Sequence, residues 1–64
     1  MEVSTKRIER HMAKQGLTQT ALAEKAGIAR PTLSNILTKG RGHTLTAFKI
    51  ARALGVDIEQ ILDD

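Results

Sequence analysis

The fold of this chain is decided by residues 16–39, which read GLTQTALAEKAGIARPTLSNILTK. A helical pattern begins after Thr18, a good helix-capping residue, and stops at Gly27, and a second one begins near Arg30. A turn of about 3–4 residues that carries a glycine sets two helices near a right angle. This spacing predicts a helix-turn-helix over about residues 18–39, although an ordinary helical hairpin would use the same residue types.

Periodicity predicts five short helices in all. They are expected at about residues 5–15, 18–26, 30–39, 44–54 and from 57 onward. Ser4 or Thr5 is expected to cap the first and Thr44 the fourth. Asp57 with Gln60 is expected to form a capping box at the start of the fifth. The residues expected to point inward are Ile8, Met12, Ala13, Leu22, Ala23, Ala26, Leu33, Ile36, Leu37, Leu45, Phe48, Ala51, Leu54, Ile58, Ile61 and Leu62. The fold class is therefore a compact all-α domain.

Length and composition narrow the possibilities. The 64 residues suffice for a single domain, 1–64, with no cysteine and with Phe48 as the one aromatic side chain. A disulfide framework, a β-sandwich and an aromatic platform for stacking bases are thereby disfavoured. No segment approaches the roughly 18 apolar residues of a membrane span, and no signal-peptide pattern follows Met1. We expect a cytoplasmic protein.

Basic residues dominate all but the last eight positions. Four of the 7 acids lie in those eight, at Asp57, Glu59, Asp63 and Asp64. All 10 lysines and arginines and the other 3 acids precede them, so residues 1–56 carry a net charge of +7. A basic body with an acidic end suits a polyanion such as nucleic acid, although scattered surface lysines would give the same balance.

The third expected helix has an outward face without acid. At 100° per residue, its apolar residues define the core direction. The positions on and beside the opposite face are Pro31, Ser34, Asn35, Thr38 and Lys39. Short side chains let a helix enter a DNA groove deeply, Asn35 can make two hydrogen bonds to adenine, and Arg30 has the length to reach guanine. A solvated face that carries little charge is the alternative.

The run from Gly16 to Ile28 resembles the lambda-repressor/Cro-like helix-turn-helix family, also called the XRE family. The continuation LSNIL at residues 33–37 fits this family, and residues 45–56 are similar to its fourth helix and the exit from it. The similarity extends from about residue 8 to residue 62. It implies a five-helix DNA-binding domain and a sequence-specific transcriptional regulator of the repressor type.

The resemblance also implies roles for single residues. It places Arg30, Pro31 and Asn35 at base-facing positions, with Ser34 on the same small face. It places contacts to the DNA backbone at Thr18, Gln19, Thr32, Thr38, Lys39 and Arg41. Gln19 matches a family position that also orients the base-reading residues, at a helix start that favours phosphate. Pro31 lacks a donor, so it either touches a thymine methyl group or only starts the helix.

Two departures from the family pattern bear on stability. Ala29 stands where relatives usually carry a capping Ser or Thr, so the third helix is expected to have a weaker cap. Met12 and Leu37 replace an Arg–Glu pair of many relatives, which avoids the desolvation of two charges.

Other residues offer open alternatives. In the loop after the third helix, Arg41 is either a phosphate contact or a solvated side chain, and Gly42 is expected to loosen the backbone. Lys6, Arg7 and Arg10 either attract DNA at long range or simply face solvent. His43 is expected to be a loop residue.

The apolar end of the chain raises the question of oligomeric state. Val56, Ile58, Ile61 and Leu62 must partly close the core, but they can also leave an exposed patch. The resemblance implies a symmetric homodimer through this end. Such a dimer would place two reading helices about 34 Å apart, on an inverted repeat of double-stranded DNA.

Other function classes fit the sequence less well. His11 and His43 lack metal-ligand spacing, so neither a metal nor another cofactor is expected. The carboxylates are too few and the volume too small for a catalytic pocket, and a small-molecule effector is not expected. The alternatives are an antitoxin-like protein-binding module with secondary DNA binding, and an architectural DNA binder without sequence preference.

Overall fold

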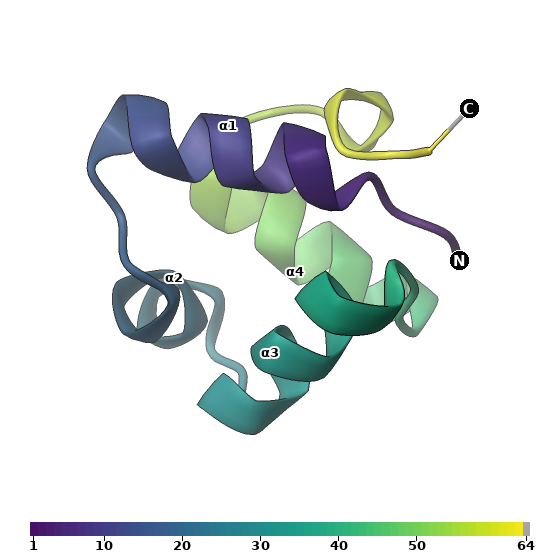
Figure 1. Ribbon diagram of the computed structural model, residues 1–64, viewed down its shortest axis with the longest axis horizontal. Coiled ribbons are helices and arrows are strands. Elements are labelled where there is room, and N and C mark those ends of the chain that lie inside the picture. Colours follow the sequence, from purple (N-terminus) through teal and green to yellow (C-terminus); the bar gives the residue numbers. More distant parts are fainter. Residues whose placement is uncertain (64) are drawn as a thin grey trace.

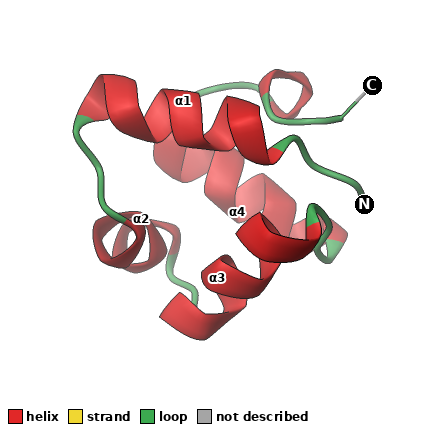
Figure 2. Ribbon diagram, in the orientation of Figure 1, coloured by secondary structure: helices red, strands yellow, loops and turns green. Residues whose placement is uncertain are grey.

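Four α-helices and one 3-10 turn make up the computed structural model, which describes residues 1–63 (Figure 1). The elements are α1 Thr5–Gln15, α2 Gln19–Ala26, α3 Arg30–Lys39, α4 Thr44–Leu54 and η1 Ile58–Gln60. In the figure α1 lies across the top, α2 and α3 lie below it, and α4 runs behind them. Figure 2 shows that short loops join the helices and that no strand is present within the described part of the chain. The all-α class is confirmed, with the helix-turn-helix in α2 and α3.

The core is made entirely of aliphatic side chains and methionine. The buried residues are Val3, Ile8, Met12, Leu22, Ala23, Leu33, Ile36, Ala47, Ile50, Ala51, Ala53, Leu54 and Ile61. Met12 is buried and Leu37 packs against the core from its edge, so both side chains belong to the apolar interior or its border. Ala13 was expected on the inner stripe of α1, but it is exposed because Ile8 and Met12 alone face the core.

Side-chain caps fix the starts of the first two helices. The Ser4 hydroxyl accepts a hydrogen bond from the Arg7 amide at 3.2 Å, and the Thr18 hydroxyl accepts one from the Ala21 amide at 3.1 Å. Both predicted caps are confirmed. Between α2 and α3 the chain turns at Gly27, whose φ of 72° belongs to the left-handed region that costs glycine little. The turn therefore depends on a residue without a Cβ atom.

The buried face of α4 differs from the prediction. Leu45 and Phe48 were expected to point inward, but they are 68% and 47% exposed. The buried residues of α4 are instead Ala47, Ile50, Ala51, Ala53 and Leu54. Positions 47, 50, 51 and 54 form a stripe with helical spacing, and the small alanines on it let α2 pack closely. Because Thr44 is already helical, His43 stands at the cap position, where its side chain accepts no hydrogen bond, so the predicted Thr44 cap is wrong.

The expected fifth helix is a single 3-10 turn. Asp57 precedes it but forms no capping hydrogen bond, so the predicted capping box with Gln60 is absent. The chain leaves the turn at Ile61, whose carbonyl accepts a hydrogen bond from the Ser4 amide at 2.7 Å. This pairing with the N-terminal segment draws the chain into an extended path, which ends the turn before a longer helix can form.

The loop after α3 is held on two sides. The Val3 amide donates to the Gly40 carbonyl at 2.9 Å, and the Gly42 amide donates to the Met1 carbonyl at 3.0 Å. A Cβ atom at Gly42 would lie 2.9 Å from Cγ1 of the buried Ile36 side chain. Gly42 was expected to loosen this loop, but it permits close packing of the loop against α3 instead.

We therefore predict that Gly42→Ala destabilises the protein by about 1–2 kcal/mol, because the added methyl group overlaps Ile36 in a packed core. Thermal unfolding should show a midpoint lower by roughly 4–8 °C for each kcal/mol. Ile36→Ala removes the obstructing atoms, so the penalty of Gly42→Ala should shrink when it is measured in that background. An equal penalty in both backgrounds would contradict this packing explanation.

Candidate nucleic-acid interface

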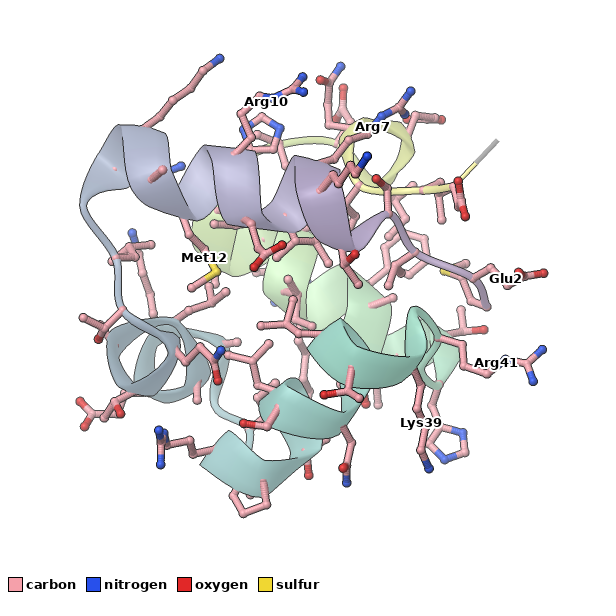
Figure 3. All side chains as sticks on the ribbon, in the orientation of Figure 1. Glu2, Arg7, Arg10, Met12, Lys39 and Arg41 are labelled. Atoms are coloured by element: carbon pink, nitrogen blue, oxygen red, sulfur yellow. The ribbon has the colours of Figure 1, made fainter. Side chains whose placement is uncertain are left out.

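The outward face of α3 is polar, exposed and free of acid. Arg30, Pro31, Thr32, Asn35, Thr38 and Lys39 are exposed, and Ser34 is half-buried. Leu33 and Ile36 point the other way, into the core. In Figure 3 the Lys39 side chain of this face extends below α3, away from α1. The sequence pattern thus correctly predicted which side of α3 faces the core and which side faces outward.

The start of α3 lacks a side-chain cap, as expected. Ala29 occupies the cap position with an extended backbone and makes no capping hydrogen bond. Pro31 lies in the first helical turn, where its missing amide removes a donor that would otherwise lack a partner. Its position in the first turn therefore fits the role of a helix starter. Its ring is exposed on the surface.

A side-chain hydrogen bond connects the two helices of the motif. The Ser34 hydroxyl donates to the Gln19 Oε1 atom at 3.0 Å. This bond holds the first residue of α2 beside the middle of α3, and it explains why Ser34 is only half exposed. One turn later, the Thr38 hydroxyl donates to the Ser34 carbonyl at 2.9 Å. The geometry thus fixes Gln19 where it can influence the outward face of α3.

The loop of residues 40–43, which follows α3 and carries Arg41 and His43, is called the basic loop. Together with α3 it borders a hollow of about 550 Å³. Its polar and charged lining residues are Thr32, Asn35, Lys39, Arg41, His43 and Thr46. In Figure 3, Lys39 and Arg41 both reach outward at the end of α3. Lys39, Arg41 and His43 thus border the same hollow as Asn35 and carry nitrogen groups that can donate hydrogen bonds to an anion. Thr46 was missed by sequence analysis, because only the packing of α4 brings it to this hollow.

Of the three N-terminal basic residues, Lys6 lines a hollow together with Thr38 and Lys39, whereas Arg7 and Arg10 lie elsewhere. Arg7 donates through Nη1 to the Leu62 carbonyl at 3.1 Å and to the Glu59 carbonyl at 3.4 Å. Arg7 and Arg10 line a separate hollow with η1 residues. Figure 3 places them beyond α1, on the side away from Lys39 and Arg41. Arg7 therefore supports the C-terminal segment, and the cations of the α3 face come from α3 and its following loop.

The residues expected at a dimer interface are unequally accessible. Val56, Ile58 and Leu62 are half-buried, whereas Ile61 is fully buried. Ile61 therefore belongs to the hydrophobic core of one chain. The apolar surface available at this end is limited to the other three side chains.

No group of three or more His, Cys, Asp or Glu residues is placed to hold a metal ion within residues 1–63. Over the same residues, no helix is both long enough and apolar enough to cross a membrane.

These features define a class of protein: a helix-turn-helix domain that presents its second helix, with an acid-free polar face and an adjacent basic loop, to a partner. A family profile described as helix-turn-helix matches residues 8–61. The chain belongs to this XRE, or lambda-repressor/Cro-like, family, which is a family of DNA-binding domains of the transcription-regulator type. No curated protein and no solved structure matches the chain significantly.

The uncapped start of α3 yields a stability prediction. Ala29→Ser supplies a hydroxyl that can accept a hydrogen bond from a free amide of the first turn, so the free energy of unfolding should rise by about 1 kcal/mol. Urea unfolding measures this change. Ala29→Val, which offers no acceptor, is the control and should give no gain. A serine variant no more stable than the original chain would contradict the proposed capping deficit.

Proposed function

We propose that this protein is a sequence-specific transcriptional repressor that inserts α3 into the major groove of double-stranded DNA. The observation that carries the proposal is the exposed, acid-free face of α3 around Asn35. Family membership supports DNA binding in general. Sequence preference follows from side chains on that face which can form hydrogen bonds to base edges.

The proposed base contacts lie along one side of α3. Asn35 is suited to adenine and Arg30 to guanine, since each can form two parallel hydrogen bonds. Pro31 offers van der Waals contact to a thymine methyl group. Ser34 donates to Gln19, so its hydroxyl oxygen remains an acceptor for an exocyclic amino group.

The proposed phosphate contacts flank this face on both sides. They are Thr18, Gln19, Thr32, Thr38, Lys39 and Arg41. The hollow beside Asn35 supports the contacts of Lys39 and Arg41, because it gathers basic side chains at the end of the reading helix. Such contacts fix the register of a protein on DNA and supply affinity without sequence preference.

Repression would follow from occupancy, because a protein bound over a promoter excludes polymerase. We further propose that residues 1–64 act as one DNA-binding domain in the cytoplasm, without a cofactor or small-molecule effector. A symmetric homodimer on an inverted repeat would double the contacts and set two α3 helices about 34 Å apart. The half-buried Val56, Ile58 and Leu62 support the interface of this dimer.

Selection of bound sequences from a random duplex library tests the base-reading proposal. We expect an inverted repeat to be enriched. Asn35→Ala should relax the preference at one position of each half-site, with a loss of about 1–3 kcal/mol for the preferred sequence.

Arg41→Gln is the matched control for that measurement. It should weaken binding to all sequences alike and reduce the magnitude of the salt slope by about 0.9. Failure to enrich any sequence would refute sequence-specific reading, and loss of preference in Arg41→Gln would refute its assignment to phosphate.

Sedimentation equilibrium tests the homodimer. A charge at position 58 would have to be desolvated in the proposed interface, so Ile58→Arg should shift the chain toward monomer and weaken binding to the inverted repeat. Phe48→Arg, which changes an exposed apolar side chain of α4, should leave the dimer intact. Dissociation by Phe48→Arg alone would place the interface on α4, and a monomer at all concentrations, with or without DNA, would remove the dimer.

A further inference from the structure

The N-terminal segment pairs with the loop that carries Arg41. Two hydrogen bonds, from the Val3 amide to the Gly40 carbonyl and from the Gly42 amide to the Met1 carbonyl, form an antiparallel bridge between Glu2 and Arg41. Both hydrogen bonds are made by the residues on either side of Glu2 and Arg41, so Glu2 and Arg41 form a pair without a backbone hydrogen bond between them. In such a pair the two Cα atoms approach to about 4.5 Å and the side chains lie on the same side of the ribbon.

Both partners of the bridge are anchored. Val3 is 2% exposed, and its other neighbour is Leu62, so the N-terminal segment runs between the loop and the C-terminal segment. The loop is fixed in turn by the packing of Gly42 against Ile36 of α3. The backbones of Glu2 and Arg41 are therefore both tied to the core through their neighbours, while their side chains are exposed.

The two side chains carry opposite charges at the edge of the proposed DNA surface. Figure 3 shows Glu2 and Arg41 projecting outward from the same edge of the molecule, beyond the end of α3. Both are exposed. Arg41 also lines the hollow beside Asn35, together with Lys39 and His43. Glu2 is thus held directly across the bridge from one of the cations that face this hollow.

We propose that Glu2 is a positioning residue that restrains Arg41, and that it lowers the affinity of the basic loop for DNA phosphate. The inference rests on the proposed phosphate contact of Arg41. In the free protein the Glu2 carboxylate attracts the guanidinium, and on binding a phosphate competes for the same donors. Part of the attraction between Arg41 and DNA is therefore offset by the loss of its attraction to Glu2 and by the repulsion between two anions.

This arrangement limits binding at sites that offer only phosphates. Phosphate contacts are sequence-independent, so restraint of Arg41 weakens attachment to operator and random DNA by the same factor. A regulator in a cell faces a large excess of random DNA, and a lower affinity for it leaves more protein free to exchange between sites. Glu2 therefore acts on how tightly the protein holds DNA, and the α3 face acts on which sequence it holds.

A double-mutant cycle tests the proposal. Binding of the original chain to its selected operator and to a random duplex is measured first, at several salt concentrations. Glu2→Gln should then raise affinity for both duplexes by about threefold, a size typical of one cross-strand charge pair, and should steepen the salt slope by up to about 0.9. In an Arg41→Gln background the same substitution should have almost no effect.

Glu9→Gln is the matched control, because it removes the same charge from an exposed position of α1. Glu9 lines neither the hollow beside Asn35 nor a second hollow between residues 3–6 and the end of α3. At physiological salt, charges separated by more than about 8 Å are largely screened, so its effect should be smaller. Asp63 is the other acid beside the loop. Because it is present in every variant, its effect on DNA affinity cancels when the variants are compared.

The outcomes are distinct. A gain in Glu2→Gln that disappears with Arg41→Gln supports the restraint. A gain no larger than that of Glu9→Gln, or one that persists without Arg41, overturns the restraint while leaving DNA binding intact. An original chain that binds neither duplex overturns the proposed function itself, and the restraint with it.

Discussion

The packing of α2 on α4 is the contact on which the rest of the molecule depends. Small buried side chains on both helices, Ala23, Ala47 and Ala51, allow the backbones to approach closely, and Ile50 is fully enclosed. A chain with so few residues can build only one core, and the packing of α2 on α4 supplies much of it. That core leaves α3 attached by one face only, with Leu33 and Ile36 inside and its polar face outside. The surface proposed to read DNA is thus the side of α3 that does not face the core.

Several local contacts then give this surface a fixed geometry. The hydrogen bond from Ser34 to Gln19 ties α3 to the start of α2. Close packing of Gly42 on Ile36 ties the loop after α3 to the same helix. These two contacts limit how far α3 and its neighbouring cations can shift relative to each other. Such rigidity matters because a base contact through two parallel hydrogen bonds tolerates little displacement.

Prediction from the sequence succeeded for some local signals and failed for others, since the predicted Thr44 cap and the capping box of Asp57 with Gln60 are absent. It also failed on α4, where the buried face was misplaced. The caps Ser4 and Thr18 and the glycine turn between α2 and α3 depend on a few adjacent residues, and all of them are found in the structure. On α4 the predicted inner stripe contained Leu45 and Phe48, which are exposed. The buried stripe is instead formed by Ala47, Ile50, Ala51 and Leu54, because it is this side of α4 that faces the core. The hollow beside Asn35 could not be foreseen in full, because it combines residues from α3, the loop and α4.

The sequence by itself determined the helical class, the helix-turn-helix between Thr18 and Lys39, and the polar face of α3, because each follows from periodicity and from residues close together in the chain. Only the tertiary structure decided that the C-terminal residues form a single 3-10 turn, that Ile61 is closed within the core, and that Glu2 lies across from Arg41. These features depend on residues roughly 40 to 60 positions apart. No local propensity encodes such pairing, since it exists only once the core has brought both ends of the chain together.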